Sequence, residues 1–225
     1  MSLLKAAWLI AAKDLRIEMR TKETVLTTSL FGVLVVVLAS LSFYIDPITS
    51  RRVAPGVLWV AIAFSGVLAM GRAWAYEREN DVMRALLLSP APRAAIFAGK
   101  AIGSLVLMLA IEAILVPLVA LFFQVDLTWA LAPALLVIVL GTVGFVAVGT
   151  LFSVLTVRSR ARDLMLSVLI FPLITPALLS SVVATRELLD GATLGETLGW
   201  LQILLAFDVL FVTAGAVLFE VLVAD

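Results

Sequence analysis

Apolar positions in this sequence gather into six long runs, and most of the charged residues lie between the runs. The runs cover Thr24–Ile45, Val57–Gly71, Ala101–Val125, Leu127–Val157, Leu164–Thr185 and Thr197–Phe219. The second run extends back to Val53, and each is then long enough to cross about 30 Å of hydrocarbon as a helix. A bilayer accepts only helices or closed barrels, and the runs lack the strand alternation of a barrel. The pattern therefore predicts six transmembrane helices.

Composition supports the same class of protein. Of the 225 residues, 63% are hydrophobic and 14% are charged, which is far from the balance of a soluble domain. No repeat, low-complexity tract or polar linker interrupts the runs. We therefore expect an all-α integral membrane protein with one transmembrane domain over residues 1–225.

The positions of the cations predict the orientation in the membrane. Thirteen of the 16 Lys and Arg residues precede the first run, or lie between runs two and three or runs four and five. The other three are Arg51, Arg52 and Arg186. Short cytoplasmic loops retain Lys and Arg, so both termini are expected in the cytoplasm. Because the charges are segregated by leaflet, we do not expect nucleic acid binding.

The segment before the first run, residues 1–23, has the pattern of an amphipathic helix. One stripe holds Leu4, Trp8, Ala11, Leu15 and Met19, and another holds Lys13, Arg16 and Arg20. A basic amphipathic helix of this kind lies in the headgroup layer with its apolar side toward the acyl chains. This segment is therefore predicted to be an interfacial helix on the inner leaflet.

A second charged segment, residues 77–90, separates the second and third runs. Glu77, Asp81, Arg84 and Leu88 recur at helical spacing, and the opposite side is formed by Val82, Met83, Leu86 and Leu87. Pro90 and Pro92 are expected to end this helix. Its position predicts a cytoplasmic helix that either contacts a soluble partner or floats at the membrane interface.

The residue types that are missing limit the chemistry of the chain. It has no Cys and no His, so disulfides, thiolate metal sites, covalent haem attachment and imidazole chemistry are unavailable. The Gly99-Lys100 pair lacks the other residues of a phosphate-binding loop. We expect no catalytic residue, no metal site and no covalently bound cofactor. Any ATP has to be bound and hydrolysed by another subunit.

Two carboxylates interrupt the apolar runs, Glu112 in the third and Asp208 in the sixth. Ionised groups are costly in hydrocarbon and often mark a proton or ion pathway. Each could equally be neutral, or bonded to a polar neighbour or a partner subunit. Small residues four apart, Gly99 with Gly103 and Gly149 with Ser153, are typical of close helix packing.

Four stretches of the sequence resemble a known family. They are RRVAPGVLWVAIAFSGVLAM at Arg51–Met70, LLLSPAPRAAIFAGK at Leu86–Lys100, LGTVGFVAVGTLFSVL at Leu140–Leu155 and LMLSVLIFPLITPALL at Leu164–Leu179. With the length and the six runs, they resemble CcmB, the membrane subunit of the haem exporter of cytochrome c maturation. The resemblance covers essentially the whole chain.

The resemblance implies a permease of the ATP-binding cassette class in the bacterial inner membrane, working with the ATPase CcmA and with CcmC and CcmD. ATP hydrolysis by that ATPase would free the haem-loaded periplasmic chaperone CcmE. Haem is a possible substrate, and two copies of the permease are expected in a complex. The charged segment would then be a coupling helix that contacts the ATPase through Glu77, Arg78, Glu79, Asp81, Arg84, Leu86, Leu87 and Leu88.

Two other functions remain open on the residues alone. One is an ion- or proton-coupled secondary transporter that uses Glu112 and Asp208. The other is a membrane scaffold that holds haem-handling partners and transports nothing. Only the permease requires a separate ATPase.

Overall fold

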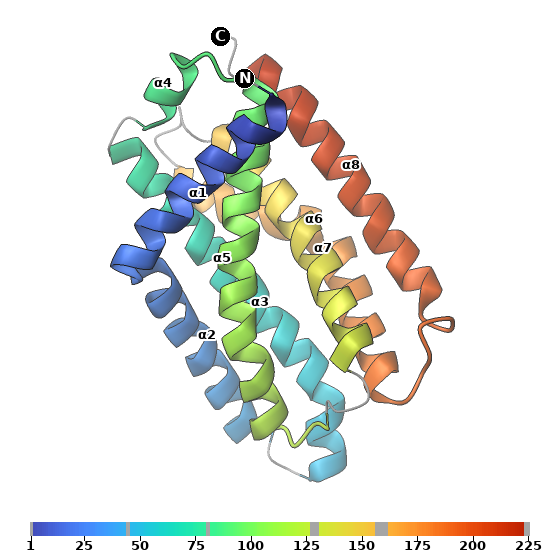
Figure 1. The fold of residues 1–225 in the computed structure, drawn as a ribbon. Coiled ribbons are helices and arrows are strands. Elements are labelled where there is room, and N and C mark those ends of the chain that lie inside the picture. Colours follow the sequence, from blue (N-terminus) through green and yellow to red (C-terminus); the bar gives the residue numbers. More distant parts are fainter. Residues whose placement is uncertain (1, 44–45, 80–81, 127–130, 156–161, 223–225) are drawn as a thin grey trace.

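The computed structural model is an all-helical bundle (Figure 1). It describes residues 2–43, 46–79, 82–126, 131–155 and 162–222; within these ranges, the side chains at 47, 74–79, 83, 84, 87, 131, 153–155, 162–169 and 220–222 are not described. Over the described residues the helices are α1 Leu3–Thr21, α2 Glu23–Ser42, α3 Pro47–Glu79, α4 Val82–Leu87, α5 Arg93–Phe122, α6 Leu131–Leu155, α7 Arg162–Leu189 and α8 Leu198–Leu222.

Five helices in the described part of the chain are long and apolar enough to cross a membrane. The spans are Glu23–Ser42, Ile48–Ala73, Arg93–Phe122, Ala132–Phe152 and Leu198–Phe219, which lie in α2, α3, α5, α6 and α8. They match five of the six runs read from the sequence. The remaining run, Leu164–Thr185, lies within α7, where the first side chains are outside the described residues.

The second span begins earlier than the apolar pattern indicates, because α3 starts at Pro47 rather than at Val53. Asp46 precedes the helix, and its Oδ1 accepts hydrogen bonds from the backbone N–H groups of Ile48 and Thr49, both at 2.9 Å. Proline at the first helical position and an acid before it are a favoured helix start. Hydrogen bonds from Thr49 lower the pKa of Asp46. The first turns of α3 are therefore polar.

A sharp corner separates α1 from α2. Lys22 adopts a left-handed backbone with φ of 54°, and its N–H donates to the Glu18 carbonyl oxygen at 2.6 Å. The Glu18 side chain then accepts from the backbone N–H of Val25 at 2.9 Å, in the first turn of α2. Glu18 thus satisfies groups at the end of one helix and the start of the next. This holds α1 at an angle across the bundle (Figure 1).

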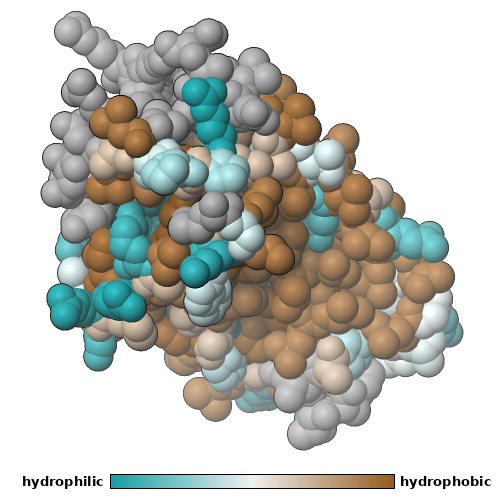
Figure 2. All heavy atoms as spheres, turned by 45° about the horizontal axis from the view of Figure 1, so that its top comes forward, coloured by the Kyte–Doolittle hydropathy of each residue, from teal (hydrophilic) through white to brown (hydrophobic). Residues whose placement is uncertain are grey.

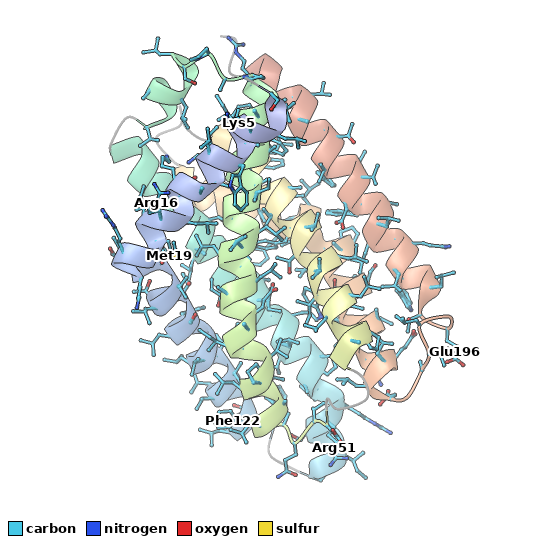
Figure 3. All side chains as sticks on the ribbon, in the orientation of Figure 1. Lys5, Arg16, Met19, Arg51, Phe122 and Glu196 are labelled. Atoms are coloured by element: carbon cyan, nitrogen blue, oxygen red, sulfur yellow. The ribbon has the colours of Figure 1, made fainter. Side chains whose placement is uncertain are left out.

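The start of α1, α4, the start of α5 and the end of α8 lie at one end of the bundle, which we call the terminal end (Figure 1). Hydrophilic side chains gather on the part of this end seen in Figure 2, and an apolar surface extends down the flank. Arg51 and Glu196 lie at the opposite end with Phe122 (Figure 3). The flanks of α2 and α8 expose large apolar side chains, including Leu30, Leu34, Leu38, Leu205, Val209 and Leu210.

The core of the bundle is fixed around Trp59 of α3. Its indole Nε1 donates to Thr185 Oγ1 of α7 at 3.0 Å, and Thr185 donates in turn to the Ser181 carbonyl oxygen at 2.7 Å. On α6, the ring lies so close to Gly141 that an added Cβ would be 2.4 Å from a ring carbon. A glycine is therefore required where α6 passes the indole. One buried side chain positions three helices.

Replacing Trp59 by Phe should remove the hydrogen bond to Thr185 while keeping most of the apolar volume. We expect a loss of about 1 kcal/mol of stability, which lowers the thermal midpoint in detergent by about 2–4 °C for a chain of this size. Trp8→Phe is the matched control, because Trp8 is 61% exposed. Equal midpoints for the two variants would contradict the role given to Trp59.

Candidate functional site

The residues of interest fall at two depths of the bundle. Helix α4 and the start of α1 lie at the terminal end (Figure 1). Glu112 and Asp208 are buried on α5 and α8.

The predicted single helix over residues 77–90 is wrong in its boundaries. Residues 77–79 are the last turn of α3, which runs on from the second span, and α4 covers Val82–Leu87 only. No proline occurs between Gly71 and Glu79, so α3 continues beyond the end of the apolar run. The shorter α4 ends because Ser89 Oγ donates to the Leu86 carbonyl oxygen at 2.6 Å, and Pro90 follows it without a backbone N–H.

The expected ATPase-contacting residues divide into three groups. Asp81 and the side chains of Glu77, Arg78, Glu79, Arg84 and Leu87 lie outside the described residues. Leu88 is 83% exposed directly after α4. Leu86 is partly buried and packs against the buried cluster that contains Ile96 and Phe97. Leu86 therefore makes an internal contact, and its contact with a partner stays a prediction.

Helix α1 packs against the bundle mainly through small side chains. Ala6, Ala7, Ile10 and Ala11 are buried, whereas Leu4, Trp8 and Met19 of the predicted apolar stripe are exposed. The partner is Gly99 of α5, where an added Cβ would lie 2.7 Å from the Ala7 carbonyl oxygen. Such a close approach of two backbones needs small side chains, so the alanines rather than the large residues face the bundle.

A partly buried ion pair, which the sequence pattern does not predict, reinforces this contact. Lys100 of α5 is 4% exposed, and its Nζ lies 2.7 Å from Asp14 Oδ2. Lys13 Nζ lies 2.9 Å from the other oxygen, Asp14 Oδ1. Asp14 is the only acid among the cations Lys5–Arg16, and Lys100 is the last cation before an apolar run. These two positions were the features of the sequence that could have indicated the ion pair.

The predicted interfacial cations therefore have different environments. Lys13 is bound to Asp14, whereas Arg16 and Arg20 are exposed. Lys5, Arg16 and Met19 mark the length of α1 in Figure 3, and Arg16 and Met19 project away from the bundle. The outer face of α1 thus carries cations beside exposed apolar groups.

Glu112 is buried and bonded to a polar neighbour, as one of the two interpretations of the sequence expects. Thr142 Oγ1 of α6 lies 2.6 Å from Glu112 Oε1 and 2.7 Å from the Ile138 carbonyl oxygen. A hydroxyl has one proton, and a carbonyl can only accept. If Thr142 donates to Ile138, as threonine commonly does in a helix, Glu112 must be the donor of the other hydrogen bond. This arrangement fits a protonated, neutral Glu112.

Asp208 lies against a different face of α6. An added Cβ on Gly144 would be 2.6 Å from Asp208 Oδ1 and 2.7 Å from a ring carbon of Phe207. Asp208 is therefore pressed against the backbone of α6. Thr142 and Gly144 are two residues apart, so the two acids reach α6 from different sides. The described contacts give no shared hydrogen bond between them.

A small apolar cavity lies between α3, α5, α6 and α7. Its volume is about 30 Å³, and its lining includes Pro55, Val116, Ile138, Thr185 and Leu189. Pockets for drug-sized ligands measure about 300–1,000 Å³, so this cavity is too small for haem. Among the described side chains, no group of three or more carboxylates is placed to hold a metal ion.

Comparison with known protein families matches residues 5–221 to the family described as CcmB protein. The chain belongs to this family. Heme exporter protein B of Haemophilus influenzae is 31% identical to it over 172 residues, 76% of each chain. The protein of that name from Pseudomonas aeruginosa is 27% identical over 199 residues, 88% of each chain, and the one from Bradyrhizobium diazoefficiens is 25% identical over 179 residues, 80% of each chain.

Membership of the CcmB family confirms the resemblance recognised in the four sequence stretches. The matched region begins in α1 and ends in α8, so it includes the charged segment, the ion pair and both buried acids. The chain spans most of the length of these heme exporter relatives.

Asp14→Ala should loosen α1 from α5, because it removes the carboxylate that binds Lys100. Hydrogen bonds to charged groups contribute about 1.5–3 kcal/mol, so faster proteolytic cleavage near the α1–α2 corner is expected. Lys13→Gln should change the cleavage rate much less, because the Lys13 side chain is more exposed than that of Lys100. Similar rates for both variants would exclude the ion pair as the attachment of α1.

Glu112→Gln should leave thermal stability and transport nearly unchanged, because a glutamine N–H can donate to Thr142 in place of the carboxylic acid. A secondary transporter that ionises Glu112 in its cycle would instead lose activity in this variant. Glu112→Leu, which removes the donor, should lower the thermal midpoint. Transport measured in Glu112→Gln distinguishes the two roles: unchanged transport supports a structural role of Glu112, and lost transport supports a proton carrier.

Proposed function

We propose that this protein is the transmembrane subunit of a haem exporter complex that acts in the biogenesis of c-type cytochromes. The observation that carries the proposal is the family match over residues 5–221, supported by relatives named heme exporter protein B. In this role the chain is not an enzyme. It is a permease subunit of an ATP-binding cassette transporter.

ATP is bound and hydrolysed by a separate, CcmA-like subunit, because this chain has no phosphate-binding loop of its own. The ATPase docks at the terminal end, on α4 and the residues around it. Exposure of Leu88 at the end of α4 supports this placement, since it offers an apolar contact at the tip of a charged segment. The charged residues at 77–84 set orientation and association rate.

The proposed topology has six spans in the bacterial inner membrane, with α7 as the fifth. Its 28 residues are enough to cross the bilayer. Both termini are placed in the cytoplasm by the distribution of Lys and Arg. Helix α1 then lies at the inner leaflet, where Arg16 and Arg20 on its exposed face can meet lipid phosphates.

The remaining partners are CcmC- and CcmD-like membrane proteins and a CcmE-like haem chaperone, with two copies of this chain in the complex. Exposed leucines and valines on α2 and α8 offer surfaces for lipid and for neighbouring subunits. In this complex, ATP hydrolysis frees the haem-loaded chaperone. Haem remains the substrate of the complex.

The proposal predicts that Leu88→Glu weakens ATPase docking. We expect less ATPase to copurify with this subunit, and haem staining of c-type cytochromes to fall in a deletion strain that carries the variant. Leu194→Glu is the matched control, because Leu194 is an exposed leucine in the loop before α8, toward the end that holds Glu196 (Figure 3).

Normal c-type cytochromes in the deletion strain itself would exclude the proposed function. If the deletion strain loses them but Leu88→Glu keeps full ATPase binding and cytochrome formation, then the docking site is wrong while the function stands. Staining of b-type cytochromes should be unchanged in every strain.

A further inference from the structure

A compact apolar cluster at the terminal end joins helices that are distant in the sequence. We call it the Phe97 cluster; its buried members are Ile10 of α1, Ile96 and Phe97 of α5, Leu151 of α6 and Phe219 of α8. Leu86 of α4 packs against it, as do Ala91 and Ala216. It is separate from the larger core around Trp59. The cluster therefore links the proposed docking element to four other helices.

Phe97 makes the closest contact in the cluster. An added Cβ on Gly215 of α8 would lie 2.2 Å from the Phe97 Cζ atom and within 2.9 Å of two more ring carbons. The Phe97 and Phe219 rings are 5.8 Å apart between centroids, tilted by 54°. The ring thus rests on the backbone of α8 and is held from one side by a second ring. Helix α5 cannot shift here without moving α8.

The connection from α4 to α5 is short and internally bonded. Ser89 Oγ donates to the Leu86 carbonyl oxygen at 2.6 Å, and the Ser89 N–H donates to the same carbonyl at 3.2 Å. The Ala91 N–H donates back to Ser89 Oγ at 3.4 Å. Pro92 is the N-cap residue before α5, and its fixed φ restricts the turn further. A displacement of α4 is therefore passed to the first turns of α5.

Those turns of α5 are also fixed to α1. Gly99 lies on the backbone of Ala7 and beside Ile10, and Lys100 is bound to Asp14. The first two turns of α5 thus contact α1 on one side and α8 on the other. These turns therefore connect α1 to α8 at the terminal end.

We propose that the Phe97 cluster is the joint that carries a displacement of α4 into α8 and α6, with Phe97 and Gly215 as positioning residues. The proposal rests on the proposed function, in which an ATPase docks on α4. It goes further because docking on α4 by itself involves only the two helices that flank this segment, α3 and α5. The geometry adds α6 and α8, and it identifies the contact of Phe97 with Gly215 that joins α5 to α8.

The test uses Gly215→Ala in the assembled complex. The new methyl group would overlap the Cζ end of the Phe97 ring, so the ring must move away from α8. We expect the ATPase to copurify and hydrolyse ATP as before, while c-type cytochrome formed per ATP hydrolysed falls about fivefold or more. Gly199→Ala is the control on the same helix, because nothing lies within 4 Å of its added Cβ.

A second variant separates coupling from folding. Phe97→Leu removes the ring end that collides with the new methyl group, so the Phe97→Leu/Gly215→Ala double variant should recover most of the lost coupling. A purely structural loss would lower the yield of complex without changing the cytochrome formed per ATP. Normal coupling in Gly215→Ala, or no recovery in the double variant, would overturn the proposal. Failure of the wild-type chain to bind an ATPase would instead overturn the proposed function.

Discussion

The architecture depends on close approach of helix backbones at glycines, because a bilayer provides no hydrophobic force that would draw apolar helices together. Three contacts show this constraint: Gly99 against Ala7, Gly141 against the Trp59 ring, and Gly215 against the Phe97 ring. At each, an added Cβ would fall within 3.0 Å of a neighbouring atom. In these three contacts the partner of glycine is the backbone of an alanine or an aromatic ring.

Polar groups add to this packing where they can be satisfied inside the bundle. Lys100 is buried but bound to Asp14, Glu112 is bonded to Thr142, and Trp59 to Thr185. Each contact joins two helices, and none requires a ligand. These three contacts therefore hold helices together, and the proposed transport role places movement at the terminal end.

The proposed docking site of the ATPase and the Phe97 cluster lie at the same end of the molecule. A short helix with an exposed apolar tip lies there, next to a turn closed by Ser89. The apolar side chain of Leu86 faces inward and makes the first contact between that helix and the cluster. A soluble subunit that displaces this helix would therefore also displace several helices of the bundle, because closely packed interiors transmit strain.

The sequence by itself determined the helical class, five apolar spans that the structure forms as helices, and the family. These properties follow from local hydropathy, from the cost of burying polar groups and from recognisable motifs. Tertiary structure decided the face that α1 buries, the inward position of Leu86, the length of α3 and the Lys100–Asp14 pair. Hydropathy could not decide these points, because lipid and protein are both apolar surroundings for a leucine. Only the shape of the neighbouring helix selects alanines over larger residues and brings together charges 86 positions apart in the chain.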